Sequence, residues 1–253
     1  MKKILVITGK ESDFSHLLQR TFSNVTILPP ETERFCPADF DALCILGGNQ
    51  EEPLLLSPSL RVCVEEMRAM KKPVFSEFVR SIAYSYLENV VHTTHHRLVY
   101  CGKVMQIPGL REGDVLDTHC NDCIHYSFRN KQTHPVLALH NYVCAHSNIQ
   151  MQEDEHKSGV WGLWCLDEST LICSFRLCNF RRARLAPRRA FEAVISAVFS
   201  FLAGERICVP FEAPVCTYRN LFTANTSAQP VYSRNMLIFI ERHNTAATPH
   251  LSA

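Results

Sequence analysis

The sequence has no long apolar run and no excess of charge of either sign. No segment approaches about 18 consecutive apolar residues, the length that predicts a membrane-spanning helix. Lys and Arg total 26 against 25 Asp and Glu, so the net charge of +1 points to no particular partner. The start, MKKILVITGK, has too few apolar residues before Gly9 for a signal peptide. We therefore expect a cytoplasmic protein without membrane contact, and we do not expect nucleic acid as a partner.

The cysteines lack the dense spacing of a disulfide-stabilised domain. All twelve are spread over 253 residues, and Cys44, Cys165 and Cys173 stand inside apolar runs. Such positions are typical of buried free thiols that act as small apolar side chains. A reduced, cytosolic compartment is the matching expectation.

A complete metal-binding pattern is also lacking. Cys120 and Cys123 form one C-x-x-C, flanked by His119 and His125, and these are residue types that zinc accepts. A structural zinc site needs a second pair, and no other C-x-x-C occurs in the chain. A redox C-x-x-C normally opens a helix after a strand, which neither flank predicts. We expect loop residues without a metal and no cofactor, and we keep zinc as the alternative.

The first half of the chain alternates strand and helix patterns. Apolar runs at 3–8, 24–28, 42–46 and 73–75 predict short buried strands. Apolar side chains at helical spacing predict helices over 13–22, capped by Ser12 or Asp13, over 57–70 and over 79–87. This alternation favours a parallel sheet with right-handed connections. The predicted fold class is α/β, a mostly parallel open sheet with helices on both faces, as in flavodoxin.

The second half is less periodic. In residues 90–150 the pattern loosens: LVYCGKVMQI can form strands, THCNDCIHYSFRNKQTHP has no clear periodicity, and we expect an irregular insertion or cap over the sheet. Two apolar runs around the turn at 167–169 predict an antiparallel hairpin over about 160–175. Pro187 then opens a helix that Gly204 ends. We predict one domain over 1–206, and an arm or linker over 207–253 through which the chain contacts another domain or a second copy.

The order DALCILGGNQ, a helix and then KKPVFSEFVRSIAYSYL resembles the first half of class I glutamine-amidotransferase-like domains. In that superfamily a strand ends in a Gly-Gly loop, and a later strand turns sharply into a helix at the nucleophilic cysteine. The segment from the hairpin to RLCNFRRARLAPRRAFEAVISAVFSFLAG is similar to non-amidotransferase members, namely ThuA-like domains and the amidotransferase-like domains attached to glycoside hydrolases. The resemblance covers about residues 1–204 and implies a flavodoxin-type core.

The departures from that family concern the reacting groups. Phe78 stands where the resemblance places the cysteine, and residues 160–204, where a His-x-Glu pair is expected, contain no histidine. Amide hydrolysis by this route needs a thiolate, a base and donors for the oxyanion, and phenylalanine supplies none of them. We therefore expect no glutaminase activity.

Candidate binding residues remain at the same places. Gly47, Gly48 and Asn49 follow a buried strand, where ligands bind in open α/β folds, although for the two glycines alone we favour a tight turn that needs positive φ. Glu77 is a candidate acid or base, or else a carboxylate that only accepts backbone N–H groups. Arg80 follows on the same turn, whereas Ser76 has no base to activate it.

An arginine cluster is the last candidate site. It comprises Arg176, Arg181, Arg182, Arg184, Arg188 and Arg189, around Asn179 and the start of the last helix. Arginine side chains at a helix N-terminus favour a bound phosphate, sulfate or carboxylate. A solvated basic face is the alternative interpretation.

Three functional hypotheses follow. The first is a catalytically altered amidotransferase-like domain that binds a small polar or anionic ligand, such as a sugar or carboxylated metabolite, between Gly47–Asn49, Glu77–Arg80 and Asn179–Arg184. Its link to carbohydrate metabolism rests on the resemblance alone. The second is a hydrolase or lyase that uses Glu77 with a histidine from the insertion. The third is a non-catalytic interaction or oligomerisation module.

Overall fold

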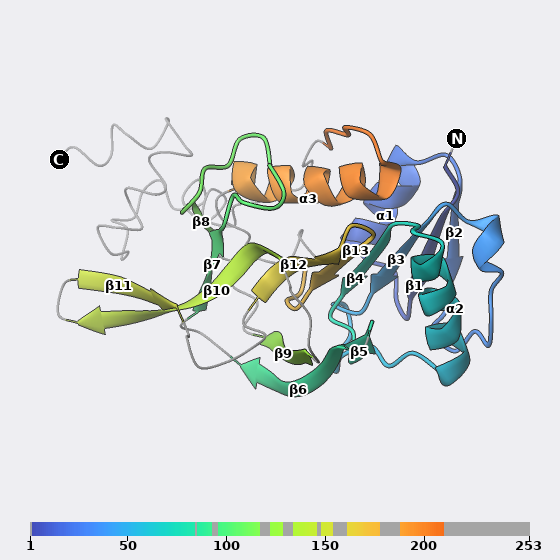
Figure 1. The fold of residues 1–253 in the computed structure, drawn as a ribbon, viewed down its shortest axis with the longest axis horizontal. Coiled ribbons are helices and arrows are strands. Elements are labelled where there is room, and N and C mark those ends of the chain that lie inside the picture. The colour runs from blue at the N-terminus through green and yellow to red at the C-terminus, as the bar shows by residue number, and fades with distance from the viewer. Residues whose placement is uncertain are drawn as a thin grey trace, which may run out of the picture.

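The computed structural model describes residues 2–83, 85–92, 96–116, 122–128, 134–145, 148–153, 161–177 and 188–209. Within these residues the chain forms three α-helices, a large open mixed sheet and a small three-stranded sheet (Figure 1). The predicted α/β fold class is confirmed.

One half of the large sheet is parallel. Its strands run in the order β2-β1-β3-β4-β13, and every neighbouring pair in this half is parallel. They are β1 (Ile4–Thr8), β2 (Val25–Leu28), β3 (Ala42–Leu46), β4 (Val74–Glu77) and β13 (Thr170–Cys173). The order matches the 2-1-3-4-5 sheet of flavodoxin-like folds. Side chains of β1, β3, β4 and β13 are buried throughout, which explains why these strands read as continuous apolar runs.

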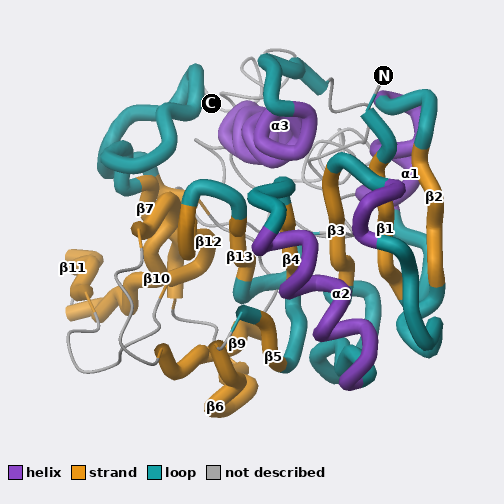
Figure 2. The backbone as a smooth tube through the Cα atoms, turned by 45° about the vertical axis from the view of Figure 1, so that its right-hand side comes forward, coloured by secondary structure: helices purple, strands orange, loops and turns teal. Residues whose placement is uncertain are grey.

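Helices cover both faces of the parallel half (Figure 2). On one face, α1 (Asp13–Thr21) and α3 (Arg188–Ala203) pack against the side chains of Ile4 and Val6. On the other face, α2 (Pro58–Ala69) packs against Leu5 and Ile7. The alternation along β1 follows from the two-residue repeat of a strand.

The predicted starts of α1 and α2 and the predicted end of α3 are confirmed, whereas Pro187, predicted to open α3, lies outside the described residues. Ser12 caps α1, since its hydroxyl accepts the N–H of Ser15 while the Ser15 hydroxyl accepts the N–H of Ser12. Ser57 caps α2 through the N–H of Leu60. Gly204 follows α3 with φ at 70°, the left-handed conformation that ends many helices.

The other half of the large sheet is antiparallel. The hairpin of β12 (Trp161–Asp167) and β13 confirms the predicted one. Beyond β12 the sheet continues through β10 (His134–Ala145), β7 (His96–Tyr100) and β8 (Val115–Leu116), and β11 (Asn148–Glu153) pairs with β10. The described residues between 90 and 150 are thus more regular than we predicted. Strands that pair with distant partners leave little local periodicity, which explains the difference.

The helix that we predicted over 79–87 is wrong. The chain forms β5 (Ser81–Ile82) and begins β6 (Ser85–His92), which pairs with β9 (Asp122–Phe128) in the small sheet. Arg80 donates its N–H to the distant Leu54 carbonyl at 2.8 Å, and Ala83 adopts φ of 55°. Both features are incompatible with a helical turn. Strand β4 therefore ends in a sharp turn without the helix that the resemblance implied.

The chain after α3 folds back along that helix. Ile207 donates its N–H to the Ser200 hydroxyl at 2.8 Å, and Val209 donates to the Ser196 hydroxyl at 3.0 Å. Val209 is 3% exposed and belongs to the core under α1 and α3. The described chain thus continues past the predicted boundary at 206, which itself stays a prediction, as does the arm beyond it. The remaining regular element is a short 3-10 helix, η1 (Pro37–Asp39). Across the described residues, no helix combines the length and the apolar character that crossing a membrane requires.

Candidate functional site at the carboxyl edge of the parallel strands

The loops that follow β1, β3, β4 and β13 meet at one edge of the parallel half. In open α/β sheets ligands bind at this carboxyl edge, and most readily where the strand order reverses, here between β1 and β3. Of the predicted site residues, Gly47, Gly48, Asn49 and Glu77 lie at this edge. The geometry of each decides whether a ligand could reach it.

Glu77 is completely buried at the end of β4. One carboxylate oxygen accepts the N–H of Leu177, from the loop after β13, and the other accepts the N–H of Gly48 at 3.4 Å, from the loop after β3. A buried carboxylate is tolerated only when hydrogen bonds compensate for its lost hydration. Glu77 therefore ties two loops together, in keeping with the structural interpretation of this residue.

The thiol of Cys44 lies in the same buried layer. Burial, and secondarily the negative charge of Glu77, raises the pKa of Cys44 well above its ordinary value. The thiol therefore remains protonated at neutral pH, and a protonated thiol is a poor nucleophile. Cys44 therefore offers no reactive thiol in place of the cysteine that the resemblance implied at position 78.

Gly47 is required for close packing and not for its conformational freedom. A Cβ atom at this position would lie 2.3 Å from the Phe78 carbonyl oxygen and 2.8 Å from the Cβ of Leu54. Its N–H donates to the Glu77 carbonyl at 2.8 Å. A turn does follow Gly47, closed by the N–H of Gln50, but the φ of Gly47 lies outside the left-handed region, so the positive φ that we offered as the explanation is wrong for this glycine. The loop after β3 sits directly against the turn after β4.

Phe78 occupies that turn in a strained conformation. Its φ is 51°, which costs a non-glycine residue on the order of 1–2 kcal/mol, and its side chain is fully buried. The N–H donates to the Cys173 carbonyl at 3.0 Å, and the carbonyl accepts the N–H of Leu54 at 3.0 Å. The strained turn is therefore held from both neighbouring segments.

Arg176 bridges the loops from the β13 side. Its guanidinium donates to the carbonyls of Gly48 at 2.9 Å, Gln50, and Glu51 at 2.6 Å. It also lies 4.2 Å from the centroid of the Phe78 ring, within the range of a cation–π contact. We expected Arg176 to belong to an anion-binding cluster. The structure shows that it binds carbonyls of its own chain.

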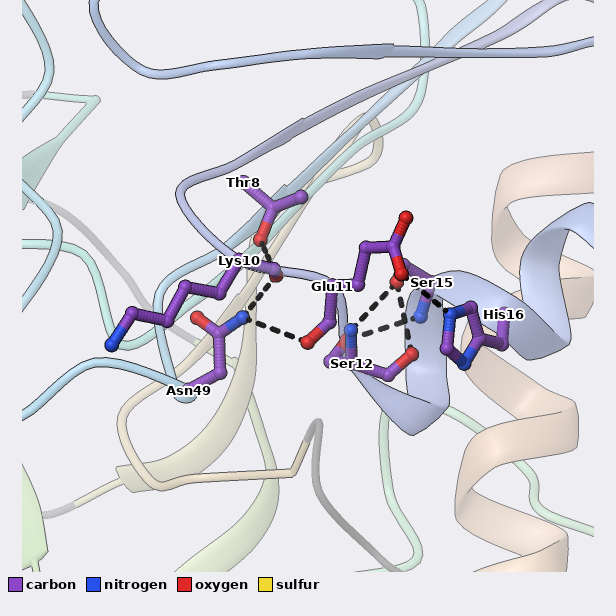
Figure 3. Close-up of polar contacts among 7 residues, drawn as sticks. All are labelled: Thr8, Lys10, Glu11, Ser12, Ser15, His16 and Asn49. Atoms are coloured by element: carbon purple, nitrogen blue, oxygen red, sulfur yellow. Dashed lines mark hydrogen bonds and ion pairs between the residues drawn. The ribbon is translucent and has the colours of Figure 1, made fainter.

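Asn49 bridges the loops after β1 and β3 (Figure 3). Its amide nitrogen donates to the carbonyls of Lys10 and Glu11, the latter at 3.4 Å, and Thr8 donates its hydroxyl to the same Lys10 carbonyl at 2.7 Å. The amide oxygen of Asn49 is buried and has no hydrogen-bond partner in the described part of the chain. The switch point between β1 and β3 is thus spanned by a side chain of the protein.

The other predicted site residues are not brought together with Glu77. Arg80 faces solvent and forms an exposed ion pair with Glu52 at 3.6 Å. The part of the arginine cluster assigned to ligand binding, Asn179, Arg181 and Arg184, lies outside the described residues.

The zinc alternative is not settled by the structure. His119 and Cys120 lie outside the described residues, and Cys123 and His125 belong to β9, where only the backbone is described. In the described residues no group of three or more His, Cys, Asp or Glu side chains could hold a metal. The zinc site and the loop without metal both stay predictions.

Two contributors to the site were missed by sequence reasoning. The Leu177 N–H is a backbone group, and no side-chain pattern marks it. Arg176 was noticed only as one of six arginines, although it differs from the others by lying three residues after the end of the buried strand β13 and directly after the apolar Phe175. A cation at the end of a buried strand is a signal for binding to neighbouring loop carbonyls.

Comparisons with known proteins identify no family. No protein-family model matches the chain, and no curated protein matches its sequence. Among solved structures, alpha-L-fucosidase isoenzyme 2 from Paenibacillus thiaminolyticus matches with a TM-score of 0.46 and 9% identity, over 70% of this chain and 29% of that one. A protein described as a GMP synthase subunit, from Thermoplasma acidophilum, matches with a TM-score of 0.46 and 12% identity, over 79% of this chain and 96% of that one.

A third structure is more distant. The exo-beta-1,4-mannosidase Op5Man5 from Opitutaceae bacterium strain TAV5 matches with a TM-score of 0.37 and 8% identity, over 80% of this chain and 35% of that one. The present chain therefore spans about a third of the length of the two glycosidases. Likenesses this low carry no argument about family or activity, and the strand order of the sheet alone establishes the flavodoxin-like fold.

Proposed function

We propose that this chain is a catalytically inactive amidotransferase-like domain that acts as a non-catalytic interaction module. One observation carries the proposal. The loops at the carboxyl edge are tied to one another by side chains of the protein, namely Asn49, Glu77 and Arg176. In this fold that edge is where a substrate would bind.

The chemistry of the edge supports the same conclusion. Phe78 has no ionisable or nucleophilic group, and Glu77 is fully buried with both oxygens engaged by backbone N–H groups. A general acid or base must come within hydrogen-bond distance of its substrate. Full burial of Glu77 therefore weighs against the hydrolase or lyase hypothesis. The histidine that this hypothesis needs, from residues 90–150, stays unidentified.

The turn after β4 supports the amidotransferase-like assignment. Phe78 keeps a positive φ at the end of a buried parallel strand, the position that the resemblance assigns to the nucleophile. Such strain persists only where the surrounding structure holds it. We interpret the turn as a nucleophile elbow that has lost its nucleophile. The non-amidotransferase branch with ThuA-like and glycoside-hydrolase-associated domains is our proposal for the closest subfamily.

A small polar ligand at the switch point is the second candidate function. The observation in its favour is the buried amide oxygen of Asn49, which has no hydrogen-bond partner in the described residues. Buried polar atoms are almost always hydrogen-bonded, so an exception needs an explanation. Because this oxygen is buried, a hydroxyl of a sugar or another polar metabolite can donate to it only if the loops after β1 and β3 move apart on binding.

Two measurements test these proposals. Ammonia release from glutamine should stay at the level of a protein-free control, and turnover by the purified chain would overturn the first proposal. Thermal-shift screening against sugars, amino acids and phosphorylated metabolites should leave the melting temperature unchanged if the chain is an interaction module, because any ligand of the native state raises it. A shift that wild type shows and Asn49→Ala loses would instead support the small-ligand candidate.

A further inference from the structure

A long groove follows α3 on the side of the helix that faces away from the sheet. Its volume is about 860 Å³, and Met105 and Pro108, in the loop between β7 and β8, form its opposite wall. The lining side chains of α3 are three or four residues apart, which places them on one face of the helix. They include Arg189, Glu192, Ala193, Ser196, Ala197 and Ser200. The groove therefore runs along α3 from its first turn to its last.

The chain itself fills one end of this groove. After Gly204 it turns back over α3 (Figure 1). Ile207 donates its N–H to the hydroxyl of Ser200 at 2.8 Å, and Val209 donates to the hydroxyl of Ser196 at 3.0 Å. Val209 is 3% exposed, whereas Cys208 before it faces solvent. The side chains therefore alternate between the groove and solvent, as in an extended strand.

The two hydrogen bonds show how this segment runs along the helix. From Ile207 to Val209 the chain advances by two residues while its partner on α3 moves back by four, so the segment is antiparallel to the helix. The steps match, because an extended chain advances by about 3.3 Å per residue and a helix by about 1.5 Å. From Ser196 to Arg189 the groove continues for about 10 Å, the length of three more extended residues. The described chain ends at Val209, where this further part of the groove begins.

The residues that follow Val209 suit the same extended path. The N–H groups of an extended chain alternate in direction, so position 210 directs its N–H away from α3, and a proline there loses no hydrogen bond. A residue before a proline favours an extended backbone, and this bias applies to Val209 and to Ala213. Phe211 comes two residues after Val209, so the two-residue repeat predicts that its side chain points into the groove.

We propose that residues 210–213 of this chain fill the rest of the groove as a strap along α3, with Phe211 as its anchor. The strap continues the two contacts already described. One turn further along α3, Phe211 lies level with Glu192 and Ala193. Its ring packs against Ala193 and the wall with Pro108, while its N–H donates to the Glu192 carboxylate. Burial of this ring removes more apolar surface from water than any other side chain of the strap.

The occupant is the chain's own segment because the chain already lies at the entrance to this part of the groove. A peptide bond holds residue 210 next to Val209, so docking is intramolecular and takes place at a high effective concentration. A separate partner would have to compete with it for the same surface. The proposal uses none of the residues at the carboxyl edge and does not depend on the inactive-domain proposal. It moves the start of the predicted arm from 207 to about 214.

Hydrogen exchange of the full chain, followed residue by residue by NMR, tests the path of the strap. The N–H groups of Ile207 and Val209 serve as the internal reference, since both are hydrogen-bonded to α3. The N–H of Phe211 should exchange at least about tenfold more slowly than an unprotected amide, because it donates to α3. Exchange of Phe211 at the unprotected rate overturns the proposal.

Replacement of the anchor tests its packing. Phe211→Ala should lower the melting temperature of the full chain by about 5 °C, because the contacts of a buried aromatic ring are lost. Phe222→Ala is the matched control, the same substitution further along the chain, and should change the melting temperature by less than about 1 °C. Phe211→Leu should retain most of the stability, since it keeps an apolar side chain in the groove. Equal melting temperatures for Phe211→Ala and Phe222→Ala overturn the proposal.

Discussion

Replacing Glu77 by glutamine tests whether the carboxylate is a structural tie. The side chain keeps its shape, and its amide oxygen can still accept the N–H of Leu177. Its amide nitrogen, however, faces the N–H of Gly48, so a donor meets a donor where the carboxylate oxygen accepted a hydrogen bond. Hydrogen bonds to a charged group contribute about 1.5–3 kcal/mol each.

We expect Glu77→Gln to lower the free energy of unfolding by about 2 kcal/mol, since one charge-assisted hydrogen bond is lost and the neutral amide is easier to bury. Glu77→Ala should cost more, about 4 kcal/mol, because both N–H groups lose their acceptor and a cavity is left. Urea denaturation measures both values, and the midpoint should fall while the slope of the transition stays unchanged.

Glu52→Gln is the matched control. The Glu52 side chain is 78% exposed and pairs with Arg80 only at 3.6 Å, so its neutralisation should change stability by less than about 0.5 kcal/mol. The reasoning is refuted if Glu77→Gln is as stable as wild type or more stable. The cost of burying the charge would then exceed the hydrogen bonds, and Glu77 would have to be retained for a reason other than stability.

Three further predictions concern the same framework. Burial raises the pKa of Asp167, but hydrogen bonds from Arg68, Ser169 and Thr170 outweigh this effect and leave the pKa below its ordinary value. Asp167 therefore stabilises the fold above about pH 4, and this contribution is lost as the pH falls further. In urea denaturation measured down to pH 2, the midpoint of Asp167→Asn should depend less on pH than that of wild type, whereas the exposed control Glu168→Gln should behave like wild type. Ser76→Ala should leave stability unchanged or raise it by up to about 1 kcal/mol, because the buried Ser76 hydroxyl has no hydrogen-bond partner in the described residues, and a clear loss in calorimetry would contradict this. Gly47→Ala should lower the free energy of unfolding by several kcal/mol in urea denaturation, because the added Cβ would clash with the backbone carbonyl of Phe78. Gly9→Ala should be tolerated, because its added Cβ would clash only with the amide end of the Gln50 side chain. Similar losses for the two variants would show that the loops after β3 and β4 move apart easily.

The parallel strands and their helices could be predicted because their signals are local. A strand buried on both faces must be apolar throughout, as in ALCIL, and a helix packed on a sheet must repeat its apolar residues at 3.6-residue spacing, as Phe191, Val194, Ile195 and Val198 do. Strand β7 falls partly in the run LVYCGKVMQI that we noted as able to form strands, whereas β10 escaped notice because it is stabilised by pairing with β7, about 40 residues away, and not by a local pattern. We predicted a helix over 79–87 because its apolar residues stand at helical spacing. In the structure, however, the N–H of Arg80 donates to the distant carbonyl of Leu54.

The candidate site shows the same division. Its location after β3 and β4 could be predicted, because the carboxyl ends of parallel strands meet at one edge. Which groups fill this site could not be predicted. Whether Arg176 faces a ligand or the carbonyl of Gly48 depends on a contact across 128 positions of the chain, which no local pattern encodes.

The sequence alone determined which chemistry is missing. At the positions that the resemblance assigns to the nucleophile and the base, the sequence has Phe78 and a stretch from 160 to 204 without histidine, and neither carries the reactive groups of the cysteine–histidine route. Only the tertiary structure decided what Glu77 does. A carboxylate is a candidate acid, base or ligand wherever it meets solvent, and it becomes a tie between loops once burial forces it to accept the N–H groups of Gly48 and Leu177. Glu77 is buried because β4 lies between β3 and β13 in the sheet. These strands lie far apart in the chain and side by side in the fold.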